Sequence, residues 1–345
     1  MEKIHKVNIK KINYDNEYGN TRLEFNINGP NIDYIVMNTI RRTIFAEIPI
    51  YAFNEFKFEK STAVFHRNYL KLRFRNMPVW GIENNIDFYN VNEKKNIYFI
   101  NINYENNADD VELDVEQNVN SSTLNQLTMY LTFKNKLMNI VTVTTDHAKY
   151  YYKEKQIENP YKIPVPLVKL QPLQEISFSA ITQLGIEEED TMYSPVSITT
   201  YIKKSDTDFN MILESRGQIT EIRILEVAII NIIRRLNNFI KTLYEDKREN
   251  LSEMEKTKLN IKTDTLQGLI LINNEDHTLG NLVTRGLQKH NKISFASYNL
   301  PHPLDKKVIF HYVLKEKGDI KGVFKDVVDY YIALFTNIKK DISNL

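Results

Sequence analysis

Apolar and polar residues alternate along residues 1–30, and an alternation with a period of two is typical of a half-buried β-strand. The apolar positions of this pattern are Val7, Ile9, Leu23, Phe25 and Ile27. The segment Gly29-Pro30-Asn31 interrupts the pattern, and glycine and proline favour turns. We therefore expect strand structure up to this turn and a different element after it.

A short amphipathic helix is predicted after the turn. Asp33 has a side chain that favours the N-cap position, and the helix should run to about Glu47 because Pro49 cannot continue it. Its apolar side would carry Ile35, Val36, Ile40, Ile44 and Phe45. The alternation then resumes and predicts a strand over residues 50–58.

Residues 81–163 have a different character, because Asn, Asp and Glu are dense and only short β-rich segments interrupt them. Two such segments are Met129–Phe133 and Ile140–Thr144. We interpret residues 81–163 as an inserted β-rich subdomain. Further strands are expected after it, at Val165–Leu170, Glu175–Ala180 and 209–213.

Two long amphipathic helices are predicted far apart in the chain. Their apolar residues recur at spacings of three and four, which places each set on one stripe. The first set is Leu225, Ile229, Ile232, Leu236, Phe239 and Leu243, and the second is Phe324, Val327, Tyr331, Leu334, Ile338 and Ile342. Each helix could form the core of its own domain, or each could pack on the other's domain. The charged segment Glu245–Lys258 between them suits a linker or a solvated helix extension.

An internal repeat appears when Asn38 is placed over Asn281, at an offset of 243 residues (281 − 38 = 243). Pairs of similar residues then coincide: Val36 with Leu279, Ile40 with Val283, Arg42 with Arg285, and Ile50 with Ile293. A strand precedes each segment, a short strand follows it, and a long amphipathic helix comes later. We interpret this as one α+β unit used twice, the first enlarged by an insertion.

The stretch NEDHTLGN, residues 274–281, places Glu275 and Asp276 beside His277. If the repeat is correct, these carboxylates lie at the positive N-terminal end of a helix, where each contributes about 0.3–1 kcal/mol. Either Asp276 or Thr278 can be the N-cap residue. Gly280 would let another part of the chain approach the first turn closely.

A metal-dependent hydrolase that uses His277 is the enzymatic alternative. The chain has seven histidines but no HExxH, GxSxG, GxGxxG or GxxxxGK pattern. It has no cysteine, which excludes disulfides, thiolate metal sites and cysteine nucleophiles. A helix-start cluster therefore explains NEDHTLGN better than a catalytic site, and we expect no metal or other cofactor.

Composition and charge point to an ordinary globular protein. The 345 residues are 42% hydrophobic and 26% charged, and the net charge of +1 does not indicate binding to nucleic acid or to an acidic membrane surface. The start of the chain lacks the apolar run of a signal peptide, and Val227–Ile233 is far too short to span a membrane. We expect a soluble, intracellular protein.

Three basic pairs stand out, and the pair Arg41-Arg42 is the most informative. The other two, Arg73 with Arg75 and Arg234-Arg235, suit a solvated helix face. Arg41 and Arg42 lie inside a short apolar helix, so at least one guanidinium should emerge beside the apolar stripe. There it could pair with carboxylates or carbonyls of another protein.

Two segments of the first half resemble the signature of the α-like subunits of cellular RNA polymerases. MNTIRRTIFAEIPIYAF (Met37–Phe53) and FHRNYLKLRFRNMPV (Phe65–Val79) carry the resemblance, and MYSPVSITTY and ESRGQI later in the chain add to it. This family comprises the bacterial α-type, the archaeal D-type and the eukaryotic third-largest polymerase subunits. Its pattern of an Asn-x-x-Arg-Arg helix and a Glu-x-Pro break matches Asn38, Arg41, Arg42, Glu47 and Pro49.

The segment Asn274–Phe310 is similar to the small partner of those subunits, which is the archaeal L-type or the eukaryotic eleventh polymerase subunit. The match rests on HTLGN, residues 277–281, and on Pro301-His302-Pro303. The chain therefore resembles a fusion of the two partners, as found in polymerases of giant DNA viruses. The resemblance covers most of the chain outside residues 81–163, and cysteine-bound metal known in some relatives cannot occur here.

The resemblance implies an α+β fold with two dimerisation modules that form an intramolecular pseudo-dimer and a β-rich subdomain inserted in the first. It implies a D-like module at 1–80 and 164–244, an insert at 81–163, a linker at 245–258 and an L-like module at 259–345. The modules would pair through Leu225, Ile229, Ile232, Leu236, Phe239, Tyr331, Leu334 and Ile338.

The function implied is that of a non-catalytic assembly platform of a DNA-directed RNA polymerase. The first module would bind the second-largest subunit and the second module mainly the largest, small accessory subunits would join, and DNA would be contacted only through the complex. The expected partner-binding residues are Asn38, Arg41, Arg42, Glu47, Asp276, His277, Asn281, Arg285 and His302. A viral source would place the protein in the host cytoplasm and the virion, and another source in the nucleus or cytosol. The alternative is a stand-alone nucleic-acid-binding or regulatory protein built on the same repeat.

Overall fold

The alternating N-terminal segment forms strands, as predicted, and the two strands pair as a β-hairpin. The computed structural model describes residues 6–17, 20–84, 86, 88–89, 97–98, 126–244, 266–302 and 306–342. In it, β1 (Asn8–Glu17) pairs with β2 (Asn20–Asn28), and the antiparallel sheet continues through β13 (Asp208–Ser215) to β12 (Val196–Ser205). The alternation places Leu23, Phe25 and Ile27 in the core, where each is at most 2% exposed.

The helix predicted after Asp33 is α1 (Tyr34–Ala46). The Asp33 carboxylate accepts hydrogen bonds from the backbone N–H groups of Ile35 and Val36, each 3.1 Å long, and so caps the helix. The predicted apolar side is buried except for Phe45, which is 41% exposed. One residue beyond Ile44 the helix has turned by about 100°, and Phe45 therefore lies away from the core.

The C-terminal part repeats this arrangement. Its elements are β14 (Gln267–Asn273), α5 (His277–Lys289), β15 (Ile293–Asn299) and β16 (Lys307–Leu314). The sheet order β14-β16-β15 matches the order β2-β13-β12 of the first sheet. The equivalent strands β13 and β16 have the same length, because their first residues and their last residues are both separated by 99 positions in the sequence (307 − 208 = 99 and 314 − 215 = 99). The strand order thus follows the internal repeat found in the sequence.

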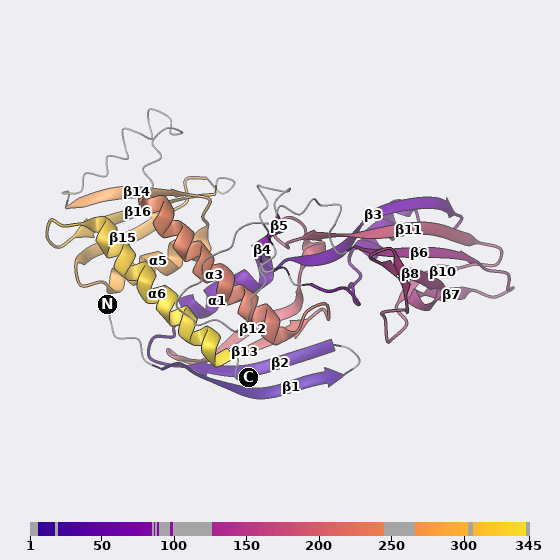
Figure 1. Cartoon of the computed structure of the whole chain (residues 1–345), viewed down its shortest axis with the longest axis horizontal. Coiled ribbons are helices and arrows are strands. Elements are labelled where there is room, and N and C mark those ends of the chain that lie inside the picture. The colour runs from indigo at the N-terminus through magenta and orange to yellow at the C-terminus, as the bar shows by residue number, and fades with distance from the viewer. Residues whose placement is uncertain are drawn as a thin grey trace, which may run out of the picture.

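The two long helices, α3 (Glu221–Tyr244) and α6 (Ile320–Ile342), run side by side across the centre of the helical part (Figure 1). The Phe239 ring of α3 stacks on Phe324 of α6, with the centroids 5.9 Å apart, and lies edge-on to Phe310 of β16 at 5.7 Å. Of the two arrangements that the periodicity left open, the structure shows the one in which each helix packs on the other half. All twelve predicted stripe residues are at most 4% exposed.

A single hydrophobic core joins the two sheets with α1, α3, α5 and α6. Close helix packing depends on Gly286 of α5, because a Cβ atom there would lie 2.4 Å from Cγ1 of Val327 in α6. Fully burying a large aliphatic or aromatic side chain stabilises a fold by about 1.5–3 kcal/mol. Burial along these stripes is therefore the main force that holds the two halves together.

A separate sheet extends away from the helices and is called the distal sheet here (Figure 1). Its strands are β3 (Ile50–Ser61), β11 (Glu175–Gly185), β6 (Leu127–Lys134), β8 (Ala148–Tyr152) and β9 (Lys155–Ile157), in that order. Two further strands, β7 (Val141–Thr144) and β10 (Pro166–Leu170), pair with each other. A second hydrophobic core fills this part of the chain.

The distal sheet differs from the insert predicted at residues 81–163. Strands β6, β8 and β9 come from that segment, but they share one sheet and one core with β3 and β11, which flank it. The core extends from Tyr51 to Leu184, so the body that interrupts the repeat begins near residue 50 and ends near 185. The proposed match of Ile50 with Ile293 fails for the same reason, because β3 pairs with β11 whereas β15 pairs with β16.

A helix that the sequence did not predict, α2 (Arg67–Arg75), covers the distal sheet. It buries only Leu70 and Phe74, and the Phe74 ring stacks on Phe178 of β11 at a centroid distance of 4.9 Å. Most of the other residues of α2 are polar, so the sequence shows only a weak apolar pattern with the period of a helix.

The remaining ordered strands are β4 (Phe88–Tyr89) and β5 (Ile97–Tyr98), which pair with each other. The predicted linker Glu245–Lys258 lies outside the described residues, as does much of the polar part of 81–163. Within the described ranges, no helix combines the length and the hydropathy needed to cross a membrane.

Candidate functional site

A cluster of charged side chains forms where α1, α3 and α5 meet. Arg235 of α3 is at its centre, and its guanidinium donates to Glu47 and Glu275 at 2.5 Å each and to Asp276 at 2.7 Å. Glu47 is the C-cap residue of α1, and Asp276 is the N-cap residue of α5. This Arg235 cluster therefore ties the end of one short helix to the start of the other.

Burial gives the members of the cluster unusual proton affinities. Burial raises the pKa of Glu275 to about 7, although Arg235 acts in the opposite direction. Burial also raises the pKa of Glu47, again against the effect of Arg235. At Asp276, the pull of Arg235 and hydrogen bonds from Thr278 overcome burial and lower the pKa to about 2. Glu47 and Glu275 therefore both hold a proton more readily than an exposed glutamate, and Glu275 does so near neutral pH.

Two further ion pairs connect α1 and α5 in a reciprocal way. Arg42 of α1 lies 3.7 Å from the carboxylate of Asp276, and Arg285 of α5 lies 3.4 Å from the carboxylate of Asp33. Both acids are N-cap residues, and both pairs of equivalents are separated by the repeat offset (276 − 33 = 243 and 285 − 42 = 243). The two helices therefore lie antiparallel and exchange equivalent contacts.

The outward side of α1 carries a stripe of exposed and half-buried residues. Tyr34 is 53% exposed and Phe45 is 41% exposed. Between them, the Arg41 guanidinium donates to Oδ1 of Asn38 over 3.2 and 3.0 Å, so the two side chains hold each other in place. This outer α1 stripe offers two aromatic rings beside a fixed guanidinium.

The equivalent stripe of α5 begins with His277, which is exposed, and continues to Asn281, which is half-buried. Nδ1 of His277 lies 3.2 Å from the hydroxyl group of Tyr298. Asp276, and not Thr278, is the N-cap residue, because its carboxylate accepts the Thr278 N–H at 2.9 Å. Within the described part of the chain, no group of three histidine or carboxylate side chains is placed to hold a metal ion.

The structure divides the predicted partner-binding residues into two groups. Asn38, Arg41, His277 and Asn281 lie on the outer stripes, and His302 is exposed in the segment after β15. The remaining four, Arg42, Glu47, Asp276 and Arg285, engage in contacts between α1, α3 and α5. Arg42, Asp276 and Arg285 link the two halves of the chain to each other, whereas Glu47 pairs with Arg235 within the first half.

Sequence reasoning missed two residues of this site. Arg235 was assigned to a solvated face, but its side chain is only 18% exposed. Glu275 was given a helix-end role alone, but it pairs with Arg235. The signal for Arg235 was its place between the apolar run Val227–Ile233 and the stripe residue Leu236.

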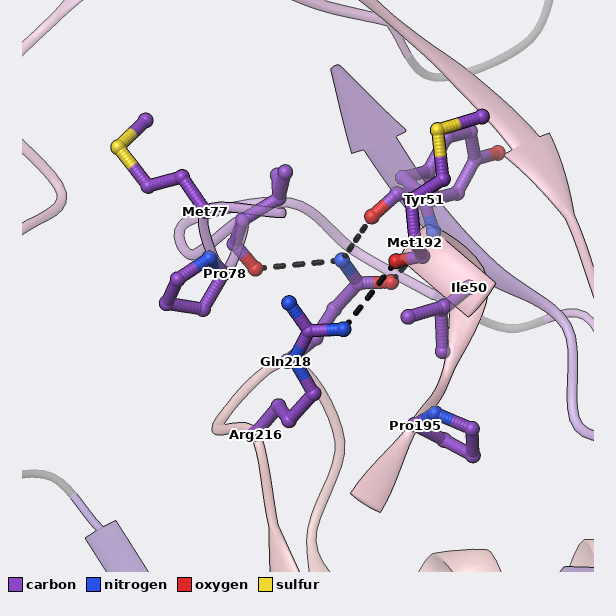
Figure 2. A pocket seen from close by; sticks show the side chains of 9 residues that line it. Ile50, Tyr51, Met77, Pro78, Met192, Pro195, Arg216 and Gln218 are labelled. Atoms are coloured by element: carbon purple, nitrogen blue, oxygen red, sulfur yellow. Dashed lines mark hydrogen bonds between the residues drawn. The ribbon is translucent and has the colours of Figure 1, made fainter. Parts of the chain in front are cut away.

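A small pocket lies where the distal sheet joins the helical part (Figure 2). The space open to a water-sized sphere is about 10 Å³, roughly the minimum for one ordered water molecule. The side-chain amide of Gln218 fills this junction by accepting from the Tyr51 N–H at 2.8 Å and donating to the Tyr51 carbonyl at 2.9 Å. The pocket therefore belongs to a structural joint and is too small for a substrate.

The preceding residues complete this joint. Arg216 donates to the carbonyl oxygens of Met192 and Ser194 at 3.2 Å each. Gly217 has a φ of +89°, and a Cβ atom there would lie 2.5 Å from Nε1 of Trp80. The segment ESRGQI, which leads from β13 to α3, thus holds the distal part of the chain against the start of α3.

Comparison with known proteins identifies the second repeat. Residues 268–341 match the family model described as the RNA polymerase Rpb3/Rpb11 dimerisation domain. The matched range begins in β14 and ends at the last turn of α6.

Several polymerase subunits are similar to parts or most of the chain. A protein named as DNA-directed RNA polymerase subunit R470, from Acanthamoeba polyphaga mimivirus, is 23% identical over 329 residues, which cover 92% of this chain and 89% of the relative. A protein named as subunit RPAC2 of RNA polymerases I and III, from Caenorhabditis briggsae, is 31% identical over 97 residues, or 26% of this chain and 67% of the relative. The RNA polymerase subunit Rpo11 of Saccharolobus shibatae is 58% identical over 38 residues, which cover 11% of this chain and 41% of the relative.

Proposed function

The chain belongs to the family of Rpb3/Rpb11-type subunits of DNA-directed RNA polymerases, and we propose that it combines both members of the pair in one polypeptide. As a member of this family it is a non-catalytic subunit of the assembly-platform type. Its part in transcription is therefore structural, and the family membership favours this function over the alternative of a stand-alone regulatory protein.

The observation that carries the proposal is the reciprocal contact between the short helices. Asp33 pairs with Arg285, and Asp276 pairs with Arg42. In a symmetric dimer, residue i of one subunit contacts residue j of the other and j contacts i. The same pattern within one chain, together with the shared strand order of the two sheets, supports an intramolecular pseudo-dimer.

The boundaries of the two proposed modules are set by the two similar sheets and the helices that pack on them. The first comprises residues 6–49 and 194–244, the second residues 266–342, and the distal sheet with its core lies between the two parts of the first. Covalent connection makes the pairing of the modules intramolecular, so it does not depend on the concentration of a separate partner.

The proposed partners are the two largest polymerase subunits. The outer stripe of α1 would receive the second-largest subunit, because two exposed aromatic rings and the guanidinium of Arg41 are residue types that dominate protein interfaces. The outer stripe of α5, which begins at His277, would receive mainly the largest subunit. Small accessory subunits would join this platform, and DNA would be contacted only through the complex.

A cellular location follows from the same proposal. The relative that aligns along most of this chain comes from a mimivirus. We therefore place the polymerase in the cytoplasm of an infected host and in the virion.

The test of this proposal examines the outer α1 stripe and the outer α5 stripe in separate variants. The chain would be tagged and produced together with the two largest subunits, carrying either Arg41→Ala with Phe45→Ala or His277→Ala with Asn281→Ala. Loss of an interface hot spot costs about 2 kcal/mol or more, so each double variant should recover at least about tenfold less of one large subunit while it retains the other.

Lys204→Ala, on the exposed end of β12, is the matched control and should recover both large subunits normally. Normal recovery of both large subunits by both double variants would contradict the proposed assignment of surfaces.

A further inference from the structure

An exposed apolar surface stands at the end of the distal sheet that lies farthest from the helices (Figure 1). It is formed by residues 135–140, between β6 and β7, and by residues 171–174, between β10 and β11. Its apolar side chains are Leu137 (63% exposed), Met138 (87%), Ile140 (64%) and Leu173 (72%). These four residues are called the tip surface here.

A buried asparagine holds the two loops of the tip surface together. Asn135 is 1% exposed; its side chain donates to the carbonyl oxygens of Leu170 at 3.0 Å and Asn139 at 2.8 Å, and accepts the Leu137 N–H at 2.9 Å. Its backbone accepts the Leu173 N–H at 3.0 Å and donates to Gln174. All the hydrogen-bonding groups of Asn135 are thus used, and the apolar side chains are displayed from a fixed frame.

The backbone at Leu173 is unfavourable for the residue that occupies it. Its φ is +66°, a left-handed conformation that favours glycine or asparagine and is strained for a larger side chain. Pro172 precedes it, and Gln174 N–H donates to the Gln171 carbonyl at 3.1 Å, so Leu173 occupies a turn position where glycine is the usual choice. A leucine that is strained and also exposed gains nothing from packing within this chain.

The surroundings of the tip surface are basic. Lys134, Lys136 and Lys169 are exposed, and residues 134–140 and 169–174 contain no aspartate or glutamate. The adjacent acid, Glu175, is paired with Lys60. The tip therefore combines apolar side chains with an excess of lysines over carboxylates, although the whole chain is nearly neutral.

We propose that the tip surface is a docking site for an acidic, apolar segment of another protein chain of the polymerase. Aliphatic or aromatic side chains of that segment cover the four tip residues, and its carboxylates face the lysines. A protein partner is favoured over a lipid surface because the chain is a subunit of a multi-chain enzyme. The site is separate from the α1 and α5 stripes, so it goes beyond the assembly function proposed above.

Photochemical cross-linking in the assembled polymerase tests this proposal. The photoreactive amino acid p-benzoylphenylalanine replaces Met138, which is 87% exposed, and the polymerase is isolated through a tag on this chain. The control position is Ile202 on β12, which is 57% exposed but lies in the other sheet. Mass spectrometry then identifies the cross-linked peptides.

The expected result is an adduct from position 138, and not from position 202, with a peptide of another subunit that contains apolar residues and aspartate or glutamate. Leu173→Gly should lower the adduct yield about tenfold, because it removes one large apolar contact, without lowering the melting temperature. Lys134→Glu with Lys136→Glu should lower it as well and change its salt dependence.

Two outcomes would overturn the proposal. One is the absence of a specific adduct from position 138, or an adduct with a basic segment, in a polymerase that still contains both largest subunits. The other is binding of the chain to vesicles of phosphatidylcholine and phosphatidylserine that Leu173→Gly abolishes, with no protein adduct. Retention of the large subunits is scored separately, so failure here is distinguishable from failure of the assembly proposal.

Discussion

At the residue scale, Arg235 is the centre of the contact between the two halves. Its guanidinium reaches Glu47 from the first half and Glu275 and Asp276 from the second. Removing one partner of a buried ion pair typically costs about 3–5 kcal/mol, because the remaining charge stays buried. The cluster therefore couples the fold of one half to the presence of the other.

The pH dependence of stability should report on Glu275. Its pKa rises from 4.5 to about 7 on burial, so the folded state holds the proton more tightly than the unfolded state. The stability that this group contributes is complete below about pH 4.5 and is lost as the pH rises through about 7. Asp276 acts oppositely, since its pKa falls from 3.8 to about 2 and its contribution is lost only as the pH falls through that range.

We predict that Glu275→Gln flattens the loss of stability between about pH 4.5 and 7.5, by roughly 1–3 kcal/mol across that range. The measurement is urea unfolding at several pH values, with Glu83→Gln as a control because the Glu83 side chain is 67% exposed and pairs with Lys153, not with Arg235. Parallel pH profiles for the wild type and Glu275→Gln would show that Glu275 does not hold a proton in the folded protein.

The sequence predicted some of these residues and not others. Asp33 and Asp276 were recognisable because aspartate before an apolar helix is a local capping signal, and both accept the expected backbone hydrogen bonds. Arg235 was not recognisable in its true role, because its three partners are 188, 40 and 41 residues away in the chain. Local patterns do not contain that information.

At the element scale, the helical stripes were the most predictable feature. The spacing of Leu225 to Leu243 and of Phe324 to Ile342 indicated one buried face on each helix, and both faces are buried. The strand β3 was predicted as a strand but was assigned to the wrong sheet. An alternating pattern shows that one face is buried, but it does not identify the neighbouring strand.

Leu236→Asp tests the packing of α3 on α6. Leu236 is fully buried, so the change removes a core side chain and buries a charge without a partner. It should cost more than the roughly 2–5 kcal/mol of a core leucine-to-alanine change. Denaturant unfolding followed by circular dichroism measures this cost.

Asn237→Asp introduces the same carboxylate one residue further, at an exposed position of α3. It should change the stability by no more than about 0.5 kcal/mol. Equal unfolding midpoints for the two variants would mean that Leu236 is not part of a packed helix junction.

At the scale of the whole molecule, the described residues of one chain provide two similar sheets and four helices that share one hydrophobic core. The repeat was visible in the sequence through the offset of 243 residues, but its true extent was not. The interrupting body begins near residue 50, since Tyr51 and Phe53 already belong to the distal core. The amino-acid composition indicated only the polar central part of this interrupting segment. The strands that flank that part alternate in the same way as the strands of the repeat, so the sequence did not distinguish them.

The copy number of the chain in the native polymerase tests the central claim most directly. Native mass spectrometry of the complex, isolated through a tag on this chain, should find one copy of the chain together with one of each of the two largest subunits. No separate subunit of the Rpb11 type should be present, because under this proposal residues 266–342 take its place. Two copies of the chain, or an additional Rpb11-type subunit bound to it, would contradict the account.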